Sequence, residues 1–192
     1  MLDLIKQLRE RTGLGIADCK KAIDESNGDI EKAIEILRKT GAIKAAKKAE
    51  RETKEGLVDS YIHPGGRIGV LLKVNCETDF VARNEEFKNL VHDIAVQIAA
   101  ADPQYLKPED VPETIKEKEK EIFREQLKRE GKPEAIVDKI LEGKLQKMYS
   151  EVCLIKQTFF KEEKITIEEL VNQTISKLGE NIQIAEFVRY KL

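Results

Sequence analysis

Tryptophan is absent from this chain of 192 residues, and aromatic residues of all kinds make up only 5% of it. No apolar run approaches the roughly 20 residues that a membrane-spanning helix needs, so we expect no membrane segment. Positive and negative side chains nearly cancel, with a formal net charge of −2, which argues against a general nucleic-acid binder. The first ten residues carry charges throughout and have no signal-peptide core, so we expect a soluble cytoplasmic protein.

Cysteine and histidine are also scarce. Cys19, Cys76 and Cys153 lie far apart and form no C-x-x-C pair, which predicts small buried hydrophobic residues. A disulfide across a dimer is the alternative. With only two histidines, His63 and His92, no zinc-ligand spacing is present, and we expect neither a metal nor a cofactor.

The common catalytic motifs are missing as well. The chain contains no G-x-S-x-G, no H-E-x-x-H, no phosphate-binding loop of the Walker type and no G-x-G-x-x-G. Neither histidine belongs to one of these motifs. We therefore expect a binding protein rather than an enzyme, and a catalytic site assembled from distant residues is the less favoured alternative.

The residues that are present predict a compact three-helix module over residues 1–41. Apolar residues recur at helical spacing in residues 2–11, 16–26 and 30–40. Gly13 is suited to a left-handed helix cap, Asp29 is a good N-cap for the third helix, and Gly41 is expected to end it.

Residues 42–54 differ from the segments on either side, because alanines alternate with basic residues. Lys44, Lys47, Lys48 and Arg51 would form one basic stripe if this segment were a helix. We expect a basic helical linker, whose stripe is either a solvated face or a surface for charge-guided docking. Aromatic residues that would stack on bases do not interleave with it.

Residues 55–192 are expected to form an α+β core, the dimerisation domain, with an antiparallel sheet flanked by helices. The expected elements are a β-hairpin (56–63 and 67–76), a helix (84–101), a helical hairpin (about 109–150), a short strand (152–157), a helix (167–177) and a closing strand with a possible irregularity (182–192). Ile136, Val137, Ile140, Leu141, Leu145 and Met148 are expected to be buried in the helical hairpin, and Ile182, Ile184, Phe187 and Val188 in the closing strand.

One stretch at the end of the hairpin is unusual. In "NCETDFVARNEEF", from Asn75 to Phe87, an acid and an aromatic residue, Asp79 and Phe80, follow a buried strand directly. From the pattern alone, Phe80 is equally suited to be a core anchor or a contact for another protein.

This stretch and the segment from Leu8 to Ala49 are also long, specific matches to a known family. The first three helices resemble a ubiquitin-associated module, and the whole chain resembles bacterial and organellar translation elongation factor Ts. "RIGVLL", "PQYLKPEDVP" and "EGKLQKMYSEVCLIKQTF" fit the same family. The resemblance implies a non-catalytic guanine-nucleotide exchange factor for elongation factor Tu.

The resemblance also implies roles for particular residues. Thr78, Asp79, Phe80 and Val81 match the segment that enters the partner near its Mg²⁺ site, with Asp79 and Phe80 as the wedge. Contacts to the nucleotide domain are implied for Leu14, Gly15, Ile16, Asp18, Cys19, Lys20 and Lys21, and contacts to a more distant domain for Ile68 and Gly69. A family histidine in the helix matching Asp93–Gln97 is absent, and His92 is offset from it.

Short members similar to this chain form homodimers, so the resemblance implies a complex of two copies of each protein. No direct contact with nucleic acid is expected. Two functions from other classes remain as alternatives. One is an adaptor that uses the first module alone, for which the "TDFV" turn would have no purpose. The other is an RNA-binding protein that uses the basic stripe.

Overall fold

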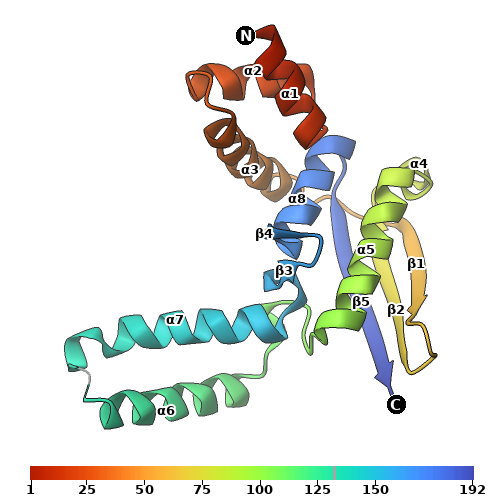
Figure 1. Ribbon diagram of the computed structural model, residues 1–192. Helices are drawn as coiled ribbons and strands as arrows, with labels where there is room; N and C mark the ends of the chain where they lie inside the picture. Colours follow the sequence, from red (N-terminus) through yellow and green to blue (C-terminus); the bar gives the residue numbers. More distant parts are fainter. Residues whose placement is uncertain (132) are drawn as a thin grey trace.

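The computed structural model describes residues 1–131 and 133–192. Three helices, α1 (Leu2–Thr12), α2 (Ile16–Glu25) and α3 (Ile30–Ala46), form a unit at one end of the molecule with a small core of their own (Figure 1). Gly13 caps α1 with a φ of 67°, as predicted. The side chain of Asp29 caps α3 by accepting a hydrogen bond from the backbone N–H of Lys32.

The expected end of the third helix at Gly41 is wrong, because α3 continues to Ala46. Gly41 is buried where α3 crosses α8 (Ile167–Leu178). A Cβ atom at this position would lie 3.2 Å from Ser176 Oγ. The glycine therefore allows two helices to approach closely, and its helical backbone does not stop α3.

The expected helical linker over residues 42–54 is also wrong beyond Ala46. Residues 47–50 form turns, and Asn181 Nδ2 donates hydrogen bonds to the carbonyl oxygens of Ala49 and Arg51. The basic side chains form no single stripe. Lys44 pairs with Asp18 at 2.8 Å, Lys48 Nζ donates to the Gly179 carbonyl oxygen at 2.7 Å, and Arg51 pairs with Glu77 at 3.4 Å. The helical stripe on which the RNA-binding alternative rested is therefore not formed as predicted.

A three-stranded antiparallel sheet forms the centre of the remaining chain, in the order β1-β2-β5. The predicted hairpin is confirmed as β1 (Glu55–Ile62) and β2 (Ile68–Cys76), and the closing strand as β5 (Ile182–Lys191). The irregularity expected in β5 is present, because Lys73 pairs with Glu186 while Val74 pairs with Ile184. Val188, expected to be buried, is exposed.

One face of the sheet packs against α5 (Glu85–Ala101), whose N-cap is Asn84 (Figure 1). Val70, Leu72 and Val74 of β2 are buried in the same core as the apolar stripe of α5. That stripe includes Phe87, Leu90, Val91, Ile94 and Ile98. The alternation along β2 therefore leaves its other residues on a sheet face that α5 does not cover.

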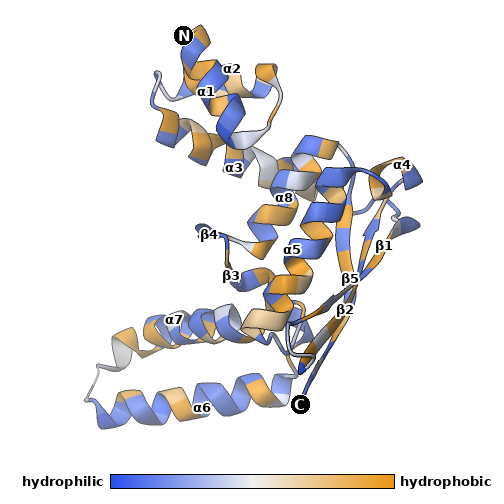
Figure 2. Cartoon of the chain, turned by 45° about the vertical axis from the view of Figure 1, so that its right-hand side comes forward, coloured by the Kyte–Doolittle hydropathy of each residue, from blue (hydrophilic) through white to orange (hydrophobic). Residues whose placement is uncertain are grey.

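The helical hairpin is confirmed as α6 (Glu113–Arg129) and α7 (Glu134–Val152), which extends away from the sheet (Figure 1). Much of α6 is hydrophilic (Figure 2). Leu141 and Leu145 are buried as expected, whereas Ile136 is exposed near the tip of the hairpin. Across the residues that the structure describes, no helix has both the length and the apolar character needed to cross a membrane.

The short strand expected at 152–157 is not found. Residues 152–157 contain the end of α7 and a 3₁₀ turn, η2 (Leu154–Lys156), with a single bridge from Cys153 to Tyr105. The strands β3 (Thr158–Phe159) and β4 (Glu162–Thr166) follow, and a second 3₁₀ turn, η1 (Pro108–Asp110), precedes α6. The Leu154 side chain is fully buried, so the apolar pattern came from core packing without a strand. The α+β class is confirmed, while the proposed domain boundaries remain a prediction.

Candidate functional site

Phe80 lies on a short helix, α4 (Asp79–Ala82), between the end of β2 and the start of α5 (Figure 1). Its side chain is 79% exposed, while Val81 beside it is buried. The interpretation of Phe80 as a core anchor is therefore wrong, and Val81 has that role. Asp79 is also exposed and pairs with Arg83 at 3.0 Å. This segment, residues 78–82, is called the Phe80 turn below, and it presents an aromatic ring next to a carboxylate.

Thr78 fixes the start of α4. Its hydroxyl oxygen accepts a hydrogen bond from the backbone N–H of Val81 at 3.3 Å, which makes it the N-cap. The Cys76 thiol donates to the Thr78 carbonyl oxygen at 3.2 Å. Burial, and then the negative charge of Glu180, raise the pKa of the Cys76 thiol to about 11. The thiol therefore keeps its proton at neutral pH and can act as this donor.

The residues implied on the first module differ in exposure. Gly15, Ile16, Lys20 and Lys21 are exposed on the α1–α2 loop and on α2, where another protein could touch them. Leu14 and Cys19 are buried in the core of the three-helix unit. Asp18 is half-buried and is held by Lys44. The exposed residues can therefore contact another protein directly, whereas Leu14 and Cys19 hold the α1–α2 loop in place by packing in the core.

Ile68 and Gly69 lie at the end of β2 opposite the Phe80 turn, and both are half-buried. Gly69 pairs with Ile62 on one side and with Tyr190 on the other. The structure therefore places the implied contacts in three separate regions: the α1–α2 loop and α2, the Phe80 turn, and the far end of the sheet (Figure 1). Such a spread is suited to an extended surface and not to a single small-molecule site.

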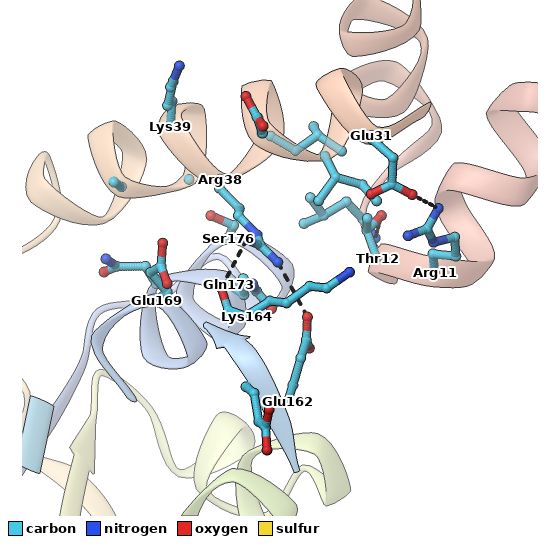
Figure 3. A pocket seen from close by; sticks show the side chains of 18 residues that line it. Arg11, Thr12, Glu31, Arg38, Lys39, Glu162, Lys164, Glu169, Gln173 and Ser176 are labelled. Atoms are coloured by element: carbon cyan, nitrogen blue, oxygen red, sulfur yellow. Dashed lines mark hydrogen bonds and ion pairs between the residues drawn. The ribbon is translucent and has the colours of Figure 1, made fainter. Parts of the chain in front are cut away.

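A cleft of about 840 Å³ lies between α3 on one side and β4 and α8 on the other (Figure 3). Arg38 bridges the two sides, because its guanidinium donates to the Lys164 carbonyl oxygen at 3.2 Å and to Glu162 at 3.3 Å. Positively and negatively charged side chains both line the cleft, so it favours neither anionic nor cationic ligands. Its described contacts instead attach the three-helix unit to the core.

Within the described part of the chain, no group of three or more His, Cys, Asp or Glu residues is arranged to hold a metal ion. All three cysteines are buried, as predicted, which leaves their thiols poorly placed to reach a second subunit. Sequence reasoning missed Glu180, which binds Thr78 at the base of the Phe80 turn. No local pattern could have found it, because the two residues are 102 positions apart.

Comparisons with known proteins identify the family. The family model described as "Elongation factor TS" matches residues 16–192. The chain is 58% identical over 187 residues to elongation factor Ts of Thermoanaerobacter sp. (strain X514), covering 97% of this chain and 92% of that protein. It is 56% identical over 191 residues to elongation factor Ts of Thermotoga neapolitana, covering 100% of this chain and 96% of that protein. The chain therefore belongs to the elongation factor Ts family of translation elongation factors.

Proposed function

We propose that the protein is a guanine-nucleotide exchange factor that binds elongation factor Tu in its GDP-bound form and promotes GDP release, so that GTP can bind. The observation that carries the proposal is the exposed Phe80 ring on a fixed turn, in a chain of this family. Exposed aromatic anchors beside a well-packed core are typical of protein-binding surfaces. The partner's role in translation agrees with a cytoplasmic location.

The physical effect would fall on the Mg²⁺ and phosphate site of the partner. A GTPase holds its nucleotide through a nest of backbone amides, a lysine and Mg²⁺, and the ion requires near-ideal octahedral geometry. The Phe80 ring, inserted between elements of the partner, would shift groups around the ion. The Asp79 carboxylate would disturb its water shell. In this scheme the exchange factor forms no covalent bond and needs no cofactor.

Exchange requires that the factor bind nucleotide-free elongation factor Tu more tightly than the GDP-bound form. By linkage, GDP must then weaken binding of the factor by the same ratio. The direction of exchange comes from the excess of GTP over GDP, so the factor itself supplies no driving force.

Docking would begin at the first module. Gly15 and Ile16 expose backbone and an apolar side chain, and Lys20 and Lys21 add positive charge nearby. A second contact would be made at Ile68 and Gly69, at the far end of β2. Two contacts that are far apart would hold the Phe80 turn in register with its target.

We also propose a homodimer in which the open faces of two sheets pack together, which gives a complex of two copies of each protein. The face opposite α5 exposes apolar side chains from all three strands, namely Val58, Ile62, Leu71, Val188 and Tyr190. A second copy presents the same apolar face, so the two faces could pack against each other. Sheets that pack face to face are separated by about 10 Å.

The dimer is tested by sedimentation velocity on Leu71→Lys. We expect this variant to shift toward monomer because it buries a charge at the centre of the face. Ile122→Lys, at an exposed isoleucine on α6, is the matched control and should leave the dimer intact. A monomeric wild-type protein, or equal effects of both substitutions, would contradict the proposed interface.

The exchange function is tested by the release of a fluorescent GDP from elongation factor Tu. The wild-type protein is expected to accelerate release strongly, and Phe80→Ala to lose most of the acceleration while remaining folded. Phe160→Ala removes another exposed phenylalanine, near β3 and β4, and should behave as wild type. No acceleration by the wild-type protein would reject the function, and full activity of Phe80→Ala would reject the wedge.

A further inference from the structure

The helix that carries Phe80 is too short to be stable alone. It has four residues, whereas isolated helices in water need about 12–15 residues even for favourable sequences. Tertiary contacts must therefore hold it. Val81 anchors one side in the core, and Asp79 and Arg83 contribute only an exposed ion pair. Ala82 packs against the same core, and α4 as a whole lies against β1, β2 and α5. The side-chain hydrogen bonds at the start of the helix converge on Thr78, the N-cap.

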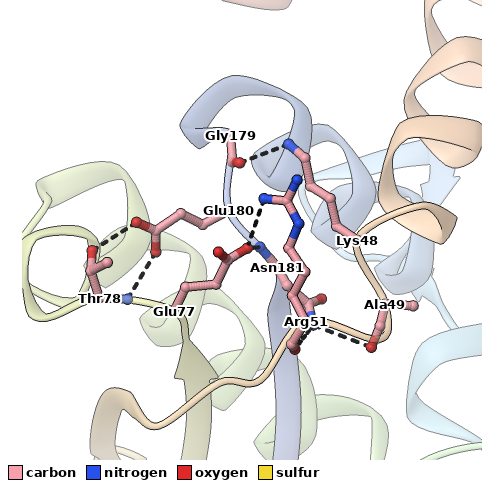
Figure 4. A network of polar contacts seen from close by, with 8 residues as sticks. All are labelled: Lys48, Ala49, Arg51, Glu77, Thr78, Gly179, Glu180 and Asn181. Carbon is pink, nitrogen blue, oxygen red and sulfur yellow. Dashed lines mark hydrogen bonds and ion pairs between the residues drawn. The ribbon is translucent and has the colours of Figure 1, made fainter.

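Glu180 binds Thr78 through two hydrogen bonds (Figure 4). The backbone N–H of Thr78 donates to Glu180 Oε2 at 3.1 Å, and its hydroxyl donates to Glu180 Oε1 at 2.7 Å. The same hydroxyl accepts from the Val81 N–H, so the carboxylate also orients the cap. Hydrogen bonds to a charged acceptor are stronger than neutral ones. Glu180 therefore fixes the backbone and the side chain of the residue that starts the turn.

Glu180 is itself held by its neighbours. It lies between Gly179, which ends α8 with a φ of 81°, and Asn181, which is only 2% exposed and directly precedes β5. The Asn181 backbone N–H donates to Glu77 at 2.6 Å, and its side chain binds the carbonyl oxygens of Ala49 and Arg51. The carboxylate thus projects from a braced turn that also contacts the segment following the three-helix unit (Figure 4).

We propose that Glu180 is a positioning residue, which holds the Phe80 turn in the orientation needed to enter the partner. The proposal rests on the proposed exchange function for its biological meaning, but the positioning is a property of the isolated protein. Without Glu180, Val81 still anchors the turn, while Thr78 loses two of its described hydrogen bonds. The turn then samples more orientations, and fewer of them present the ring correctly.

The absence of tryptophan gives a direct test of positioning, because Phe80→Trp places the only tryptophan of the chain on the turn, and its emission can be excited apart from that of the four tyrosines. Time-resolved anisotropy of Phe80→Trp is compared with the same variant carrying Glu180→Ala or Glu180→Gln. We expect faster local motion with Glu180→Ala and an intermediate effect with Glu180→Gln, since an amide retains one acceptor oxygen. Glu121→Gln, on α6, removes the same charge elsewhere and should not change the decay. Unchanged motion in Glu180→Ala would overturn the proposal.

The consequence for exchange is measured in the chain with Phe80 intact. Glu180→Ala should lower the GDP release rate at saturating factor by about tenfold, the scale of one hydrogen bond to a charged group. The concentration giving half-maximal release should change much less, because the α1–α2 loop and the sheet still dock. A change only in that concentration would contradict a positioning role. An inactive wild-type protein would reject the exchange function and leave the anisotropy result to decide the positioning of the turn.

Discussion

Truncation of Phe80 is expected to leave the stability of the protein nearly unchanged, although phenylalanine is one of the largest apolar residues. Only about a fifth of its surface is buried, since 79% is exposed. For a side chain that can bury roughly 200 Å², this fraction is about 40 Å², which corresponds to about 1 kcal/mol at most. Phe87, seven residues later on α5, is fully buried. Phe87→Ala should lower the free energy of unfolding by about 3–5 kcal/mol.

The two variants form a matched pair, because the same atoms are removed from neighbouring helices. Urea denaturation followed by circular dichroism gives the free energy of unfolding of each variant relative to wild type. We expect the loss for Phe80→Ala to be several times smaller than the loss for Phe87→Ala. A loss above about 3 kcal/mol for Phe80→Ala, in the range of buried phenylalanines, would show that the ring packs inward in solution.

Two further predictions concern stability. Gly56→Ala should lower the free energy of unfolding by at least about 2 kcal/mol, because a Cβ atom there would lie 2.2 Å from the Val74 carbonyl oxygen. Urea denaturation of this variant showing wild-type stability would contradict that packing. Burial is the main cause that raises the pKa values of Cys76 and Cys153 to about 11, above the reference value of 9.0. The contribution of the two buried thiols to the free energy of unfolding is therefore complete below pH 9. It is lost as the pH rises through 11, by roughly 1–3 kcal/mol per thiol. Urea denaturation at pH 8 to 11 should therefore show a smaller fall in the free energy of unfolding for a Cys76→Ala, Cys153→Ala double variant than for wild type. An equal fall in both proteins would show that the two thiols are not its cause.

Local signals in the sequence were sufficient to predict much of the fold. Asp29, Asn84 and Thr166 cap their helices through their own side chains, and Gly13 and Gly179 adopt left-handed caps. Each of these signals acts within one turn of helix, so the sequence displays it directly. The alternating strands of the sheet were equally visible, including the irregularity in β5.

Features that depend on distant residues could not be predicted in this way. Glycine is a residue type that commonly ends helices, which is why Gly41 was expected to do so. Its actual role is set by Ser176 on the facing helix α8, which it allows to approach closely. The carbonyl groups of Ala49 and Arg51 are bound by Asn181, so the alanine- and lysine-rich segment does not remain helical. Exposure of Phe80 was undetermined by the local pattern, because it depends on which neighbour, Phe80 or Val81, faces α5 and the sheet.

The central claim is that the Phe80 turn couples binding of this protein to loss of GDP. The most direct measurement is the dissociation constant of this protein for elongation factor Tu, with and without saturating GDP, for wild type and Phe80→Ala. We predict much tighter binding without GDP for the wild-type protein, and a ratio close to one for Phe80→Ala. By linkage this ratio equals the weakening of GDP by the factor. An equally large ratio in both proteins would contradict the claim and assign the coupling to another contact.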